Sequence, residues 1–208
     1  MEPFLSRVID YHLAPHSPWT YLGHERFVKL ARETGASIRV RPIDLGKVFP
    51  VSGGLPLAQR APQRQAYRLV ELRRISKSLG LPMNIEPKFF PVATGPASLL
   101  IIAVDLKDGT EAALRLSAAL LTAVWVQERN IADPATLATV LAECELPAER
   151  LAESTTPEVA AVYERYSREA IEAQVFGAPS YVLDGEIFWG QDRLDLLAEA
   201  LAGPTRGA

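Results

Sequence analysis

The residues best suited to chemistry begin at Ser17, which stands between a strand-like and a helix-like stretch. Residues 8–13 favour a strand, and apolar residues recur at helical spacing after Pro18. Proline suits the first helical position, because the amide hydrogen that it lacks has no partner there, so Ser17 becomes the N-cap. Its hydroxyl then lies at the positive end of the helix dipole. It can cap the helix, which is the commoner role, or hold an external anion.

A second informative stretch, residues 176–194, predicts a hairpin followed by a helix. Its two strand-forming triplets are joined through Asp184-Gly185, a dipeptide that supplies the positive φ of a tight turn. Gly190 breaks the second strand, and Asp192 opens a helix whose first turn can gather backbone N–H groups around an anion. We expect the N-terminus of this helix to face the same cleft as that of the first helix.

Four segments together carry a family resemblance: Ser-Pro-Trp-Thr-Tyr-Leu at 17–22, Arg-Pro-Ile-Asp-Leu at 41–45, the helical stretch 67–74, and residues 176–194. Ser-Pro before a helix is common by itself. Followed by Phe-Gly-x-Pro and Trp-Gly-x-Asp-Arg-Leu, in that order, it is hard to reach by chance. The chain, over nearly its whole length, resembles the 2-hydroxychromene-2-carboxylate isomerases and their relatives, the kappa-class glutathione transferases.

This resemblance implies an α/β, thioredoxin-like fold of the DsbA and kappa glutathione transferase type, with an inserted all-helical domain. The thioredoxin-like domain would comprise residues 1–46 and 176–208, as a βαβ unit plus a ββα unit. Residues 47–175 would form the inserted helical domain, including a loop that covers the cleft.

The local patterns agree with that division. We expect a strand at 7–13, a helix at 18–34 closed by Gly35, and a strand at 37–43. The middle of the chain has little strand character and predicts helices at 67–79, 96–107, 109–129, 134–144 and 157–175. In the helix at 67–79 the leucines and Ile75 share one face, whereas Arg68 and the other charged residues are expected to point mostly outward.

The resemblance also implies glutathione as cofactor. In thioredoxin-like folds the peptide bond before Pro179 is cis, and the backbone of Ala178 can pair with an extended, peptide-like ligand. The cysteinyl part of glutathione would add there as a short strand, with its thiol toward Ser17. Further glutathione contacts are implied at Trp189, Gly190, Gln191 and Asp192, where Asp192 would accept from the γ-glutamyl ammonium. The structural alternatives are a turn proline and a helix cap at Asp192.

Ser17 is the predicted catalytic residue. A free thiol has a pKa of about 8.5 and reacts as the thiolate, so a hydroxyl donor at a helix N-terminus raises the reactive fraction. The resemblance implies that glutathione thiolate adds to 2-hydroxychromene-2-carboxylate, a bond becomes free to rotate, and elimination yields trans-o-hydroxybenzylidenepyruvate. His16 is adjacent, but neighbours on such a turn seldom point the same way, so we expect no general base for Ser17.

The implied substrate is an aromatic carboxylate, and a cationic wall should therefore face Ser17. Lys47, Arg60 and Arg64 lie in the Pro- and Gly-rich segment 46–64, which we expect to cover the cleft, and Lys47 and Arg64 are the preferred pair. The structural alternative is that these side chains are solvated surface charges.

At two places in this wall the chain has residues that differ from those usual in the family that it resembles. Gly53 and Gly54 stand where relatives often have Asn, and Arg64 stands where many have Lys, although we keep all three as substrate-binding candidates. Phe90, with Phe89 and Trp19, would supply an aromatic floor for a bicyclic substrate. Such aromatics are more often core residues.

Composition sets outer limits on function. With 208 residues, 48% of them hydrophobic, and a net charge of −3, the chain can bury one sizeable core and presents no basic field for nucleic acid. We expect no signal peptide or membrane span, and hence a cytoplasmic protein. The lone Cys144 and three unpaired histidines predict neither a disulfide nor a metal site. Relatives on this fold suggest a homodimer.

Two alternative functions stay open. A kappa-type glutathione transferase would use the same site and leave the thiolate attached to an electrophile. A redox-inactive DsbA-like module would hold extended peptides beside Pro179. Disulfide exchange is excluded by the residues themselves, because no cysteine pair stands in the motif at Ser17.

Overall fold

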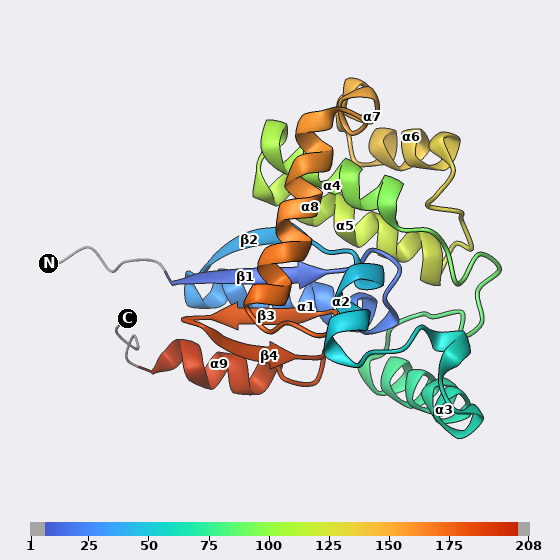
Figure 1. The fold of residues 1–208 in the computed structure, drawn as a ribbon, viewed down its shortest axis with the longest axis vertical. Coiled ribbons are helices and arrows are strands. Elements are labelled where there is room, and N and C mark those ends of the chain that lie inside the picture. Colours follow the sequence, from blue (N-terminus) through green and yellow to red (C-terminus); the bar gives the residue numbers. More distant parts are fainter. Residues whose placement is uncertain (1–6, 204–208) are drawn as a thin grey trace, which may run out of the picture.

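The protein is described by a computed structural model over residues 7–203 (Figure 1). Its sheet contains β1 (Val8–Leu13), β2 (Ser37–Pro42), β3 (Ser180–Leu183) and β4 (Glu186–Trp189), in the order β2-β1-β3-β4. β1 and β2 are parallel, whereas β3 runs antiparallel to both β1 and β4. The βαβ unit near the N-terminus and the hairpin near the C-terminus therefore form one sheet, as the sequence predicts.

Helices cover both faces of this sheet. Figure 1 shows α8 (Pro157–Glu172) in front of it and α1 (Pro18–Thr34) behind it, with α9 (Leu194–Ala202) beside β4. The helices between the two halves of the sheet are α2 (Leu45–Ser52), the short 3-10 helix η1 (Leu57–Gln59), α3 (Pro62–Leu79), α4 (Gly95–Asp108), α5 (Thr110–Trp125), α6 (Pro134–Glu143) and α7 (Glu149–Glu153). α2 and α3 lie toward the carboxyl end of β1, where the chain passes into α1.

The core continues from the sheet into the helical layer. Tyr11 of β1 and Tyr181 of β3 stack with ring centroids 5.5 Å apart, and Phe27 of α1 packs on Tyr181 at 4.5 Å. The same hydrophobic cluster includes buried residues of α4 and α5, such as Leu100 and Leu116. The domain boundaries at 46/47 and 175/176 stay a prediction, and their outermost residues, 1–6 and 204–208, lie outside the described residues.

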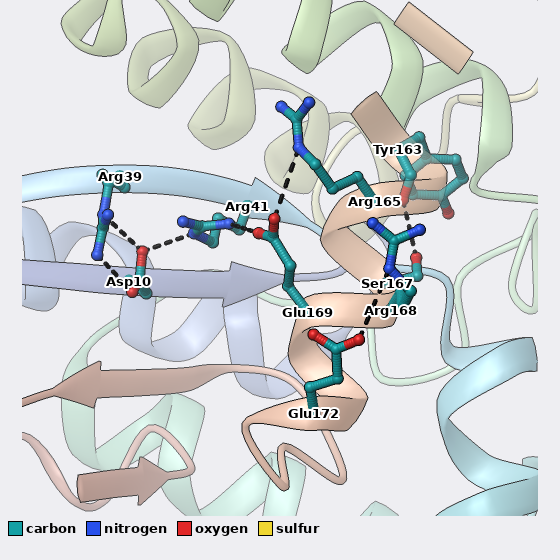
Figure 2. Close-up of polar contacts among 9 residues, drawn as sticks. All are labelled: Asp10, Arg39, Arg41, Tyr163, Arg165, Ser167, Arg168, Glu169 and Glu172. Atoms are coloured by element: carbon teal, nitrogen blue, oxygen red, sulfur yellow. Dashed lines mark hydrogen bonds and ion pairs between the residues drawn. The ribbon is translucent and has the colours of Figure 1, made fainter. Parts of the chain in front are cut away.

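An ion network fastens α8 across the sheet (Figure 2). The Asp10 carboxylate on β1 accepts from Arg39 at 2.8 Å and from Arg41 at 2.6 Å, both on β2. Arg41 also pairs with Glu169 on α8. Two residues before Glu169 on α8, the Ser167 hydroxyl accepts from the N–H of Asp44 at 3.0 Å. Because Asp44 is the N-cap of α2, this contact also fixes where α2 begins.

Several predicted boundaries agree with the structure and others need correction. α1 matches the prediction, with Gly35 at φ 69° as its end. α5 ends at Trp125, earlier than predicted, because Val126 at φ −120° leaves helical geometry, and α8 ends at Glu172, because Gln174 adopts a positive φ just after the C-cap. The segment 46–64, expected as a loop, contains α2 and η1, and α3 begins at Pro62. No helix within residues 7–203 is long and apolar enough to cross a membrane.

Candidate active site

The Ser17 hydroxyl lies between the N-terminus of α1 and the 178–179 peptide. As the N-cap, it accepts from the Thr20 N–H at 3.2 Å, which confirms the predicted capping role. The same hydroxyl donates to the carbonyl oxygen of Ala178 at 3.1 Å. Ser17 is 5% exposed. The hydroxyl is therefore positioned by a helix end on one side and by the segment leading into β3 on the other.

Within the described residues, the segment leading into β3 places the unpaired N–H of Ala178 beside Ser17. The Ala178–Pro179 bond is cis, as the resemblance implies, and the Pro179 carbonyl accepts from the Gly190 N–H at 2.9 Å. Within residues 7–203 the N–H of Ala178 has no hydrogen-bond partner. Buried N–H groups in proteins are normally paired. Main-chain addition of an extended ligand is one way to pair it.

The predicted glutathione residues at 189–192 follow this peptide and differ in exposure. Trp189 is half exposed and packs on Phe176 with centroids 4.8 Å apart. Gly190 has a φ of 106°, a conformation that favours glycine. Gln191 is buried, and its side-chain oxygen accepts from Arg26 at 2.9 Å. The acceptor end of the Gln191 amide is thus already used by the protein.

Asp192 has an exposed carboxylate that pairs with Arg193 at 2.8 Å. The alternative that Asp192 caps the last helix is wrong, because the N-cap of α9 is Arg193 and no side chain caps that helix. The prediction that Asp192 opens the helix is corrected in the same way, since α9 begins at Leu194. The Asp192 carboxylate therefore has no capping task that would compete with a ligand's ammonium.

Comparison with known proteins agrees with the fold. The DSBA-like thioredoxin domain model matches residues 9–202. The chain is 30% identical to a 2-hydroxychromene-2-carboxylate isomerase of Pseudomonas putida, over 93% of this chain and 94% of the relative. It belongs to the 2-hydroxychromene-2-carboxylate isomerase family.

A solved 2-hydroxychromene-2-carboxylate isomerase superposes with a TM-score of 0.80 at 26% identity, over 94% of each chain. The chain is also 23% identical to glutathione S-transferase kappa 1 of Rattus norvegicus, over 97% of this chain and 93% of that relative. The DsbA-like thioredoxin fold predicted from the sequence is thereby confirmed, as is the resemblance to this isomerase family.

Four of the predicted substrate-binding residues, Lys47, Gly53, Gly54 and Arg64, lie on α2, on α3 and in the segment between them, whereas Phe90 lies between α3 and α4. Lys47 is exposed on α2 and forms an ion pair with Glu164 of α8. Gly53 ends α2 at φ 75°, and a Cβ at Gly54 would collide with the ring of Phe49. The positive φ at Gly53 and the closeness of Phe49 to Gly54 explain why glycine occupies these two positions. A role for any of them in holding substrate stays a prediction.

The arginines of this region are not equivalent. Arg64 is exposed on α3. Arg60 is half-buried, and its Nε donates to the carbonyl of Leu55 at 2.8 Å. Arg68, expected to point outward, is instead 9% exposed. The expectation fails because the buried face of α3 runs through Arg68, Leu72 and Ser76, one turn apart along the helix.

The Arg68 side chain packs among aromatic rings. Its guanidinium carbon lies 4.9 Å from the ring centroid of Phe90 and 5.8 Å from that of Trp125. Phe90, a predicted substrate contact, also stacks with His16 at 5.9 Å. Since His16 precedes Ser17, these rings connect Arg68 with the start of α1. Sequence reasoning missed Arg68 because its partners lie far along the chain.

Burial alters the proton affinity of two of these groups. Burial, and then the charge of Arg60, lower the pKa of Arg68 to about 10. Burial, and then the charge of Arg68, lower the pKa of His16 to about 4, so this imidazole is neutral near pH 7. Ser17 bonds to Ala178 and Thr20, and no hydrogen bond joins it to a histidine within residues 7–203. Its hydroxyl is accordingly arranged as a donor.

Elsewhere the described residues offer little competing chemistry. Between residues 7 and 203, no three His, Cys, Asp or Glu side chains are grouped so as to hold a metal ion. Cys144 is half-buried at the end of α6, and burial raises the pKa of its thiol. It packs against the main hydrophobic cluster.

Proposed function

We propose that the protein is a glutathione-dependent isomerase that interconverts 2-hydroxychromene-2-carboxylate and trans-o-hydroxybenzylidenepyruvate in aromatic catabolism. The observation that carries this proposal is the position of the Ser17 hydroxyl, at a helix N-terminus and 3.1 Å from the carbonyl oxygen of Ala178. The names of the relatives at 26–30% identity support the isomerase reaction. The relative named as a kappa glutathione transferase supports the cofactor.

The residues present fit glutathione. The unpaired N–H of Ala178 can donate to a main-chain carbonyl of an extended ligand. The exposed carboxylate of Asp192 suits the γ-glutamyl ammonium, and the segment Trp189–Gly190 lies between them in the chain. Ser17 has a hydroxyl that suits the sulfur. The chain thus offers a hydrogen-bond donor to the glutathione backbone, a carboxylate to its ammonium group and a hydroxyl to its thiol.

When bound, glutathione supplies a thiolate that adds reversibly to the conjugated substrate and is released unchanged. The task of Ser17 is to hold that thiolate. The Ser17 hydroxyl donates to the Ala178 carbonyl, so its proton must turn toward the sulfur when glutathione binds. The Ala178 carbonyl is then free to accept from a ligand N–H. After this exchange of partners, the Ser17 hydroxyl and the Ala178 carbonyl both still have a hydrogen-bond partner. The hydroxyl donor and the helix dipole favour the thiolate form of the sulfur.

The isomerised substrate would lie against the side of the site formed by α2 and α3. Phe90, which is partly exposed and stacks on His16, is the aromatic contact that we propose there. Lys47, Gly53, Gly54 and Arg64 remain proposed substrate contacts. We further propose that the protein is cytoplasmic and forms a homodimer, and light scattering of the purified protein would test the dimer.

The kappa relative favours glutathione transfer as the second candidate, because the same site could leave the sulfur bonded to an electrophile. The deciding experiment mixes protein, glutathione and 2-hydroxychromene-2-carboxylate and measures product and free thiol together. Isomer formation with constant free thiol supports the proposal. Stoichiometric thiol loss with an electrophile supports transfer. Failure to bind glutathione at millimolar concentration favours the peptide-binding module beside Pro179.

A further inference from the structure

Three polar atoms lack partners within one cluster of aromatic and basic side chains. The cluster consists of Arg68, Phe90, Trp125 and His16, and we call it the Arg68 cluster. In the described part of the chain, Arg68 Nη2, Trp125 Nε1 and His16 Nδ1 are buried without a hydrogen-bond partner. Arg68 and Trp125 nitrogens can only donate. Arg68 and Trp125 therefore offer donors that have no acceptor within hydrogen-bond distance among the described residues, whereas His16 Nδ1 donates or accepts according to its tautomer.

The positive charge of Arg68 is also uncompensated. Its guanidinium makes ring contacts with Phe90 and Trp125, and no carboxylate pairs with it among residues 7–203. After burial, the cause that lowers the pKa of Arg68 is the charge of another cation, Arg60. Burying an unpaired charge costs free energy, and buried cations in proteins normally have an anionic partner. An arrangement of this kind indicates an anion that is supplied from outside.

The Arg68 cluster is continuous with the candidate active site. His16 immediately precedes Ser17, stacks on Phe90, and Phe90 in turn lies under the Arg68 guanidinium. His16 and Phe90 are partly exposed, whereas Arg68 and Trp125 are buried. Because the guanidinium carbon of Arg68 lies 4.9 Å from the Phe90 ring centroid, a ligand that contacts this partly exposed ring comes close to the guanidinium. A flat aromatic acid suits these neighbours, because its ring can stack and its carboxylate can accept from Arg68.

We infer that Arg68 binds the carboxylate of an aromatic acid substrate, whose ring packs against Phe90 and His16. This inference rests on the proposed function, whose substrate is an aromatic carboxylate. It assigns recognition of the substrate carboxylate to Arg68. The surface-facing candidates Lys47 and Arg64 are less suited to this role. Lys47 already pairs with Glu164, and Arg64 is exposed, where screening weakens its attraction for an anion.

The test measures binding of a non-reacting probe and turnover of the substrate in the same set of proteins. The probe is 2-hydroxybenzoate, and its neutral counterpart is 2-hydroxybenzamide, both titrated calorimetrically into the full chain with and without glutathione. The variants are Arg68→Met, Arg68→Lys and, as the matched control, Arg73→Gln, an exposed arginine on the same helix. Thermal denaturation checks that each variant is folded. Methionine fills similar space without charge, so we expect it to fold.

The wild-type protein should bind the benzoate more tightly than the benzamide. Arg68→Met should weaken benzoate binding and raise KM roughly 10- to 100-fold, as expected for a lost charge-assisted hydrogen bond, with a smaller effect on kcat. Arg68→Lys should retain part of the preference, and Arg73→Gln should behave as wild type.

Equal binding of benzoate and benzamide by wild type would overturn the inference, and this comparison needs no variant. Unchanged benzoate binding in folded Arg68→Met would overturn it as well. Failure of the proposed function looks different, because benzoate would bind through Arg68 while no glutathione-dependent isomerisation occurs. Isomerisation that is indifferent to Arg68→Met would reject the inference and leave the proposed function standing.

Discussion

Ser17 and Ala178 are joined by a hydrogen bond of 3.1 Å, although 161 positions separate them in the sequence. The bond brings the N-terminus of α1 and the segment before β3 to one point. Since Ser17 also caps α1 through the Thr20 N–H, a single hydroxyl contributes to helix stability and to the candidate site. The functional and structural readings of Ser17 are therefore compatible.

Replacing Ser17 with Ala should reduce turnover far more than glutathione affinity. The lost donor matters most to the thiolate, and removing a donor to a charged group costs roughly 10- to 100-fold in kcat. Loss of the cap should also lower the free energy of unfolding by about 1 kcal/mol. Steady-state kinetics and glutathione titration measure the two effects separately. Ser17→Thr, which keeps the hydroxyl and the cap, is the control, and unchanged kcat in Ser17→Ala would refute the role.

Replacing Asp192 with Asn should weaken glutathione binding by about two- to fivefold, because an exposed ion pair is worth about 1 kcal/mol or less. The change should leave kcat nearly intact, since the γ-glutamyl end is remote from the sulfur. Asp195→Asn, an exposed carboxylate in the first turn of α9, should have no effect on affinity. A selective loss of kcat with normal affinity would contradict the assignment of Asp192 to the ammonium.

The sequence predicts the elements whose ends carry strong local signals. Pro18 and Gly35 define α1, and Asp184-Gly185 defines the hairpin, where both residues adopt positive φ. The sequence does not predict the ends of α5 and α8, because Val126 leaves helical geometry and Gln174 adopts a positive φ without being glycine. No local sequence pattern predicts such a conformation at a valine or a glutamine.

In the candidate site, too, the sequence predicts some residues and not others. The Ser17 and Ala178–Pro179 segments were found because each combines a local motif with the family resemblance. Arg68 was missed because charged residues on a helix normally face water. Its burial depends on Phe90 and Trp125, which the fold brings to α3 from later parts of the chain. A helical pattern cannot specify partners of that kind.

Acid should destabilise the protein through its histidines. Burial lowers the pKa values of His12, His16 and His24 to about 4, whereas unfolded histidine titrates near 6.5. Between these values the unfolded chain binds more protons, so stability present above pH ~6.5 is lost as pH falls toward ~4. Each histidine contributes about 1.4 kcal/mol per pH unit to this slope.

Denaturant unfolding at several pH values measures that slope directly. His12→Gln is the informative variant, because His12 Nδ1 is buried without a partner within the described residues. The variant should reduce the slope between pH ~4 and ~6.5 by about 1.4 kcal/mol per pH unit, the share of one proton. An unaltered slope would show that His12 does not titrate on unfolding.

Replacing Cys144 with Ala should leave glutathione-dependent activity unchanged. The thiol is half-buried at the end of α6, and burial raises its pKa, which lowers its reactive thiolate fraction. The measurements are the glutathione-dependent activity of the variant and the disulfide reductase activity of the wild type. Loss of activity on folded Cys144→Ala would indicate that the protein's own sulfur takes part.

The most direct test of the account is the pKa of the glutathione thiol when bound to the wild-type protein. Thiolate absorbance would be followed in the ultraviolet as pH is varied, with glutathione in saturating complex, and the same titration repeated on Ser17→Ala. The account predicts a bound-thiol pKa below about 8.5 that rises when Ser17 is removed. A bound thiol that titrates at its free value in both proteins would contradict it.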